Sequence, residues 1–157
     1  MELFLLRHGH AESEAPSDRE RRLSVLGRQE VAQVVQAQRD ALAKVKQLWV
    51  SPFLRAQQTA QIVASHFPTL SLQTTDLLVP GGQTEVLIDF LHERFHTQNA
   101  GSILLVTHQP LVGTLLDELC GLEPGRHRMA TASLAALDVD VMAANCCSLR
   151  RIEHVLG

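Results

Sequence analysis

Four residues that can handle phosphate each lie shortly after a short apolar run of this sequence: Arg7, His8, Arg55 and His108. The planar guanidinium of arginine can bind two phosphate oxygens at once. A neutral imidazole can accept a phosphoryl group and pass it to water, which splits hydrolysis into two easier displacements. Two arginines and two histidines without a carboxylate nearby therefore predict a pocket for a phosphoryl group.

The two histidines of this set suit different roles. His8 is the expected nucleophile, because the positive charge of neighbouring Arg7 should lower its pKa and favour the unprotonated ring nitrogen. His108, together with Arg7 and Arg55, is expected to bind the equatorial phosphate oxygens as charge redistributes in the transition state. Taken singly, a histidine after a strand is more often a cap or a surface residue, and an arginine in a first helical turn is more often a solvated charge. Their convergence from three segments favours the functional interpretation.

Three continuous apolar runs must position these residues. Residues 3–6, 48–50 and 103–106 are typical of short strands buried on both faces of a sheet. Each is followed by a segment with helical periodicity, which predicts a largely parallel sheet with helices on both faces, a three-layer α/β/α sandwich. The carboxyl ends of such strands share one edge, where ligands bind. Weaker strands are expected at residues 70–72, 133–137 and 147–152.

Several residues indicate where the helices begin and end. Ser24 and Thr84 are expected N-caps, and Gly121 is expected to end the helix that follows Pro110. Ser51 suits an N-cap with Pro52 at the first helical position, which would place oriented N–H donors at the pocket.

Composition narrows the class of protein. The chain has 157 residues, with 45 % hydrophobic and 20 % charged residues, which predicts one folded domain over residues 1–157. A net charge of −3 argues against nucleic-acid binding, and no apolar run is long enough for a membrane span.

The three cysteines, Cys120, Cys146 and Cys147, fit neither a disulfide framework nor a zinc site. Together with an N-terminus unlike a secretory signal, this favours a cytoplasmic protein. We expect it to act as a monomer.

Three blocks of the sequence resemble the histidine phosphatase superfamily, also called phosphoglycerate-mutase-like, and the small size and loop pattern resemble its SixA-type phosphohistidine phosphatases. The blocks are Leu6-Arg7-His8-Gly9, Ser51-Pro52 with Arg55-Ala56 and Gln58-Thr59-Ala60, and the segment from Val106 to Gly113; the loop pattern is Asp18, Arg21, Leu23 and Gly27.

The resemblance implies a phosphoglycerate-mutase-like fold and a phosphohistidine intermediate on His8. It implies that Arg7, Arg55 and His108 complete the phosphate pocket, with no metal and no cofactor. Arg21 falls where this subfamily carries an arginine near the pocket, although in a polar loop it could equally be a solvated charge.

Larger members of the superfamily carry a glutamate general acid in an insertion, but the corresponding region here, residues 70–101, is short. Asp76 and Glu85 are the nearby carboxylates. Expelling an alkoxide, with a conjugate acid of pKa about 16, calls for a proton donor, whereas the conjugate acid of imidazole has a pKa of about 6.5. An open pocket without an acid therefore favours phosphohistidine on a partner protein, such as a phosphorelay or phosphotransfer carrier.

Two alternatives stay open. The chain could be a phosphatase of small phosphate esters that uses Asp76 or Glu85 as its acid, or a module that binds phosphorylated partners without turnover. The segment 126–128, Arg-His-Arg, is either a solvated turn or a means of steering an acidic partner.

Overall fold

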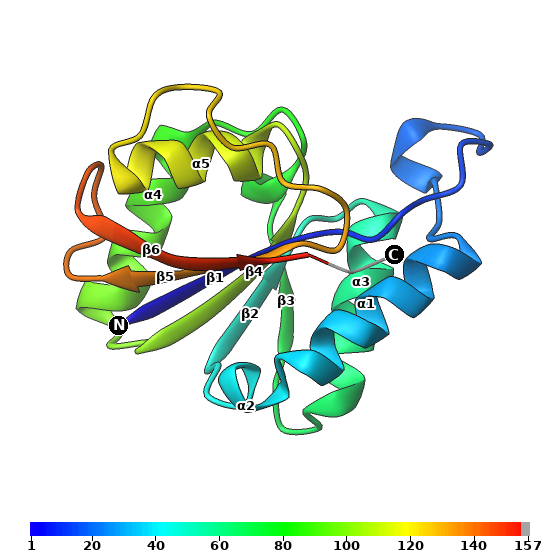
Figure 1. The fold of residues 1–157 in the computed structure, drawn as a ribbon, viewed down its shortest axis with the longest axis horizontal. Coiled ribbons are helices and arrows are strands. Elements are labelled where there is room, and N and C mark those ends of the chain that lie inside the picture. Colours follow the sequence, from blue (N-terminus) through cyan, green and yellow to red (C-terminus); the bar gives the residue numbers. More distant parts are fainter. Residues whose placement is uncertain (155–157) are drawn as a thin grey trace.

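The computed structural model describes residues 1–154 and contains one six-stranded sheet in the order β3-β2-β4-β1-β5-β6 (Figure 1). Strands β1 to β4 run parallel to one another, whereas β5 and β6 are antiparallel. This confirms the mostly parallel mixed sheet. The strands are β1 Glu2–Arg7, β2 Gln47–Val50, β3 Leu72–Thr74, β4 Ser102–Thr107, β5 Leu134–Val139 and β6 Cys147–Glu153.

Helices cover both faces of the sheet, as the three-layer prediction requires (Figure 1). The longer ones are α1 Val25–Ala37 and α3 Leu54–His66 on one face, and α4 Thr84–His92 and α5 Leu111–Cys120 on the other. The short elements are η1 Asp18–Glu20, α2 Arg39–Leu42, η2 Asp76–Leu78 and the π-helical turn η3 Glu93–Thr97.

Strand β1 joins two hydrophobic cores because its side chains alternate between the faces of the sheet. Leu3 and Leu5 pack toward α4 and α5, whereas Phe4 and Leu6 pack toward α1 and α3. All four are almost fully buried. Each such side chain contributes about 1.5–3 kcal/mol through removal from water, so the centre of the sheet is a rigid base for the residues that follow β1.

The helix boundaries agree with the sequence in part. The Ser24 hydroxyl accepts a hydrogen bond from the Gly27 N–H at the start of α1, and Gly121 ends α5 with a left-handed φ of 65°. The prediction for Ser51 and Pro52 is wrong, since α3 begins at Leu54. Thr84 is already helical, and the N-cap is the preceding residue. None of the helices within residues 1–154 is long and apolar enough to cross a membrane.

Candidate active site

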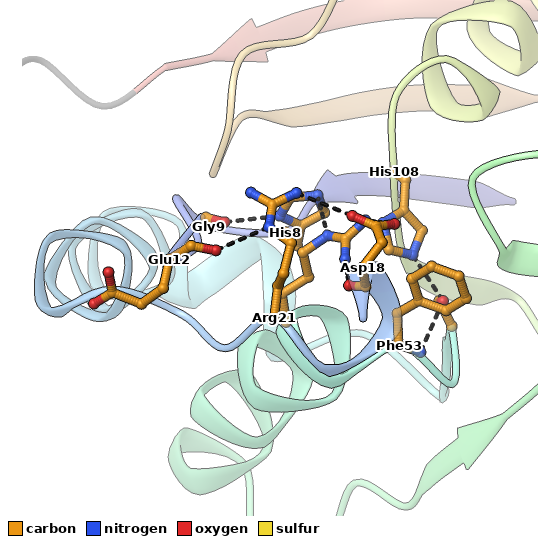
Figure 2. A network of polar contacts seen from close by, with 9 residues as sticks. His8, Gly9, Glu12, Asp18, Arg21, Phe53 and His108 are labelled. Atoms are coloured by element: carbon orange, nitrogen blue, oxygen red, sulfur yellow. Dashed lines mark hydrogen bonds and ion pairs between the residues drawn. The ribbon is translucent and has the colours of Figure 1, made fainter. Parts of the chain in front are cut away.

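The ends of β1 and β4 and the first turn of α3 bring four predicted residues to one edge of the sheet. The ring centroids of His8 and His108 are 5.0 Å apart, and Nε of Arg55 lies 3.3 Å from Nε2 of His8. Arg7, the last residue of β1, is close enough for its charge to act on both histidines. Figure 2 shows His8, Arg21, Asp18 and His108 grouped beside α3.

The imidazole of His8 has a defined tautomer. Its Nδ1 lies 2.7 Å from the carbonyl oxygen of Gly9, and because a carbonyl only accepts, Nδ1 must carry the proton. Nε2 therefore carries the lone pair and accepts the hydrogen bond from Nε of Arg55. His8 is 6 % exposed, so this unprotonated nitrogen is largely shielded from solvent.

Close backbone contacts fix the loop that carries His8. The Gly9 N–H donates to Oγ1 of Thr59 at 3.1 Å, and the same hydroxyl donates to the Arg55 carbonyl at 2.8 Å. A Cβ on Gly9 would lie 2.8 Å from the Gly27 carbonyl oxygen, and one on Gly27 would lie 2.0 Å from the His10 carbonyl oxygen. Both positions therefore require glycine, because α1 packs directly against this loop.

His108 is 1 % exposed, and a serine orients its ring. Its Nε2 lies 2.7 Å from Oγ of Ser51, which also accepts a hydrogen bond from the Phe53 N–H at 3.2 Å. The Phe53 ring packs edge-on against the imidazole at 5.1 Å. Ser51 therefore orients the second histidine and does not cap α3, so the donors expected from a helix start at Ser51 are not placed there.

Two polar atoms in this cluster are buried and unpartnered. Within residues 1–154, the buried side-chain nitrogens and oxygens without a hydrogen-bond partner are Nε of Arg7, Nδ1 of His108 and Oγ of Ser102. Arg7 is held by a 2.8 Å hydrogen bond from Nη1 to the Met129 carbonyl. Because orphaned buried groups are rare, two at one site indicate that the arrangement suits a ligand with acceptor oxygens.

A carboxylate lies at the site, contrary to the prediction that none would be near. Nη1 and Nη2 of Arg55 contact the Asp18 carbonyl oxygen at 2.7 Å and Oδ2 at 3.2 Å. Nη1 of Arg21 contacts Oδ1 of Asp18 at 3.1 Å, and its Nε donates to the Glu12 carbonyl at 2.8 Å. The polar loop folds back over α3 because the buried charge of Arg55 requires a partner.

Burial dominates the electrostatics of the two histidines. It lowers the pKa of His8 to about 4, against the raising effect of the hydrogen bond to Gly9, with smaller lowering by Arg55 and Arg7. Burial also lowers the pKa of His108 to about 3, helped by His8 and Arg55. The prediction that positive charge lowers the pKa of His8 had the right direction, but desolvation is the larger cause.

The Asp18 carboxyl has a lowered pKa, whereas a general acid must keep its proton at neutral pH. Its hydrogen bond from Arg21 and the charge of Arg55 hold its pKa below the ordinary value, although partial burial acts against this. Asp18 is therefore ionised at neutral pH. The other two carboxylates considered, Asp76 and Glu85, are exposed and form no hydrogen bond or ion pair with the four clustered residues in the part of the chain described.

Comparison with known proteins identifies the family. The family model of the histidine phosphatase superfamily (branch 1) matches residues 3–79. The phosphohistidine phosphatase SixA of Escherichia coli (strain K12) is 31 % identical over 144 residues, covering 89 % of this chain and 86 % of the relative. The chain belongs to the histidine phosphatase superfamily. The phosphoglycerate-mutase-like fold expected from the sequence is thereby confirmed.

Further relatives of this histidine phosphatase support the same family. A SixA homolog of Haemophilus influenzae (strain ATCC 51907 / DSM 11121 / KW20 / Rd) is 34 % identical over 130 residues, covering 77 % of this chain and 78 % of the relative. The solved structure of the protein histidine phosphatase SixA complexed with tungstate aligns with a TM-score of 0.88 at 28 % identity. The alignment covers 98 % of this chain and 97 % of that one.

The structure of this histidine phosphatase gives three residues roles that the sequence analysis did not assign to them. Asp18 holds two arginines, Ser51 orients His108, and Thr59 joins the Gly9 backbone to α3. Thr59 stands one helical turn after Arg55, a spacing that could have indicated its role, whereas the contact of Asp18 spans 37 residues and has no local signal. Residues 1–154 contain no group of three side chains arranged to bind a metal ion.

Proposed function

We propose that this chain is a phosphohistidine phosphatase that removes the phosphoryl group from a histidine of a partner protein through a covalent intermediate on His8. One observation carries the proposal. Nε2 of His8 is an unprotonated, buried nitrogen fixed by the Gly9 carbonyl, and it faces a guanidinium 3.3 Å away. A nucleophile for phosphorus needs such a lone pair beside positive charge.

The two displacements follow from this geometry. Nε2 of His8 attacks phosphorus as the bond breaks to a substrate ring that is protonated on its other nitrogen, so that this ring leaves as neutral imidazole. Water then attacks the phosphorylated His8, whose Nδ1 keeps its proton, and releases inorganic phosphate, a proton and neutral His8. The unpartnered nitrogens of Arg7 and His108 bind phosphoryl oxygens together with Arg55. When the Ser51 hydroxyl donates to Nε2 of His108, neutral His108 carries its proton on Nδ1 and can donate it to an oxygen.

The state of Asp18 favours phosphohistidine over an ester. Its carboxyl is held ionised by Arg21 and Arg55, so it cannot protonate a leaving alkoxide at neutral pH. A phosphohistidine ring that carries a proton on its other nitrogen leaves as neutral imidazole, whose conjugate acid has a pKa of about 6.5, and needs no such help. The curated relatives named phosphohistidine phosphatase SixA support the same substrate class.

The proposal includes the setting of the reaction. Residues 1–157 form one domain that needs no metal or other cofactor and acts as a cytoplasmic monomer, with Arg21 supporting the substrate pocket through Asp18. The substrate is a phosphohistidine-bearing protein, and phosphate or another oxyanion occupies the pocket of Arg7, His8, Arg55 and His108.

A comparison of three substrates tests the proposal. The purified chain is incubated with a phosphohistidine protein, a phosphoserine peptide and an aryl phosphate, with chelator present, and phosphate release is measured. We expect release to be fastest from phosphohistidine and to accompany an acid-labile phosphoenzyme trapped by rapid quenching. Equal or faster release from phosphoserine, lost in Asp76→Asn or Glu85→Gln, would favour a small-ester phosphatase. Binding of phosphohistidine protein without release would favour a non-catalytic module.

A further inference from the structure

A groove of about 460 Å³ shares Arg7 with the proposed phosphate pocket. Three of its lining residues, 128–130, belong to the loop that joins α5 to β5, whose path Figure 1 shows. Its lining contains two arginines and no carboxylate, although the chain as a whole carries a net charge of −3. The lining residues are Arg7, Gln109, Pro110, Arg128, Met129 and Ala130.

The neighbours of Arg128 hold it in place. The His127 ring lies 2.8 Å from a carboxylate oxygen of Asp117, which is 2 % exposed. The Met129 side chain is buried, its N–H donates to Oε1 of Gln109 at 3.3 Å, and its carbonyl accepts the hydrogen bond from Arg7. With residues 127 and 129 both tied to the body of the protein, the exposed Arg128 is presented at the groove.

The guanidinium of Arg128 is available to bind an anionic group of a ligand. Within residues 1–154 it forms no ion pair and no hydrogen bond through its side chain, unlike Arg21 and Arg55, which share Asp18. The Met129 carbonyl that receives Arg7 belongs to the next residue, so the position of Arg128 is coupled to that of the phosphate pocket. A ligand that reaches both arginines must extend beyond its phosphorylated group along the groove.

We propose that Arg128 is a specificity residue that binds a carboxylate side chain flanking the phosphohistidine of the partner protein. This inference rests on the proposed function and names a feature of its substrate. A guanidinium binds a carboxylate through paired N–H donors, and charge complementarity across a surface sets partner choice and association rate. Apart from Arg7, which is assigned to the phosphoryl group, the groove residues beside Arg128 are uncharged, so one acidic side chain suffices as the matching group.

The test uses two phosphohistidine peptides that are identical except that the flanking Asp and Glu residues of one are Asn and Gln in the other. The ratio of kcat/KM for the acidic peptide to that for the amide peptide is the readout. An exposed charge pair is worth about a 1.5- to 5-fold preference, and we expect wild type to prefer the acidic peptide by that factor.

Substitutions of Arg128 distinguish an effect of its charge from a general effect on the structure. Arg128→Ala should bring the ratio close to one, Arg128→Glu should reverse it, and Arg128→Lys should keep part of it. Arg39→Ala is the matched control, since Arg39 is an exposed arginine of α2, far from the loop between α5 and β5, and should keep the wild-type ratio (Figure 1).

Three outcomes would overturn the inference. If wild type hydrolyses both peptides at the same rate, or if Arg128→Ala keeps the preference for the acidic peptide, Arg128 does not bind a carboxylate of the substrate. If a small phosphate ester bearing a carboxylate depends on Arg128 more than the acidic peptide does, the groove serves a metabolite. If wild type hydrolyses neither peptide, the proposed function itself fails and the inference fails with it.

Discussion

Within residues 1–154, two pairs of histidine rings lie close together, and their surroundings differ. The rings of His8 and His108 are 5.0 Å apart, and those of His92 and His96 are 4.6 Å apart. The first pair is buried at the ends of two parallel strands. The second lies one helical turn apart where α4 passes into η3, with His92 exposed and His96 accepting a hydrogen bond from the Met142 N–H at 3.0 Å.

The surroundings make the difference. Arg55 points its Nε at His8, whereas Arg94, between the second pair in sequence, stacks on Phe90 at 4.1 Å and Trp49 at 5.3 Å. An arginine packed on aromatic rings supports the fold and leaves the nearby imidazoles without a directed cation. Close imidazoles alone therefore do not make a phosphoryl-transfer site; burial, a fixed tautomer and an aimed guanidinium are required.

Replacing one histidine from each pair should give the largest contrast. His8→Ala removes the nucleophile and should reduce phosphate release from phosphohistidine protein by more than about 10³-fold. His92→Ala should keep the wild-type rate, because the side chain is exposed and distant from the pocket. Initial rates with a phosphohistidine protein measure both. A His8→Ala rate within tenfold of wild type would contradict the nucleophilic role.

His108→Ala should have the next largest effect. Losing one preorganised donor to the phosphoryl oxygens lowers kcat by about 10²–10³-fold, while His8 can still be phosphorylated. His96→Ala, from the other pair, should leave kcat unchanged even if it lowers the melting temperature. Single-turnover kinetics of phosphoenzyme formation distinguish the two. Unchanged phosphorylation of His8 in His108→Ala would remove His108 from the first displacement.

Asp18→Asn should strengthen oxyanion binding. The Asp18 carboxylate competes for Arg55 and repels an incoming phosphate, whereas the contact of Arg55 with the Asp18 backbone carbonyl survives the change. We expect inorganic phosphate to bind about 1.5- to 5-fold more tightly, as one exposed charge interaction allows. Calorimetric titration gives the Kd. Weaker binding would show that the carboxylate matters more for orienting Arg55 than for competing with phosphate.

The burial of His8 and His108 should also make the free energy of unfolding depend on pH, and this is the smallest of the expected effects. The pKa values of His8 and His108, about 4 and about 3, lie below the ordinary value of 6.5. At a pH between these lowered values and 6.5, His8 and His108 are protonated in the unfolded chain but not in the folded chain. The free energy of unfolding should therefore fall by about 1 kcal/mol per pH unit for each buried histidine as pH decreases from 6.5 toward 4.

Urea denaturation at pH 6.5 and pH 5 measures this loss. His8→Gln and His108→Gln should each be less acid-sensitive than wild type, and His92→Gln, at an exposed position, is the control substitution. Equal acid sensitivity of all four proteins would mean that the buried pair is protonated within the fold.

Local sequence patterns determined the elements and the list of candidates. Continuous apolar runs predicted β1, β2 and β4, because a strand buried on both faces needs no alternation. Parallel strands then carry the residues at their carboxyl ends to one edge, so Arg7, His8, Arg55 and His108 could be named without coordinates. These inferences depend on neighbours within a few residues along the chain.

Only the tertiary structure decided the partners of those residues. The Asp18 contact with Arg55, the Ser51 contact with His108 and the Met129 contact with Arg7 span 37, 57 and 122 residues. No local pattern encodes such pairs, because they form when buried polar groups must find partners after the strands and helices have packed. The same packing excluded water from His8 and His108, which is why burial, more than the charge of Arg7, sets their pKa values.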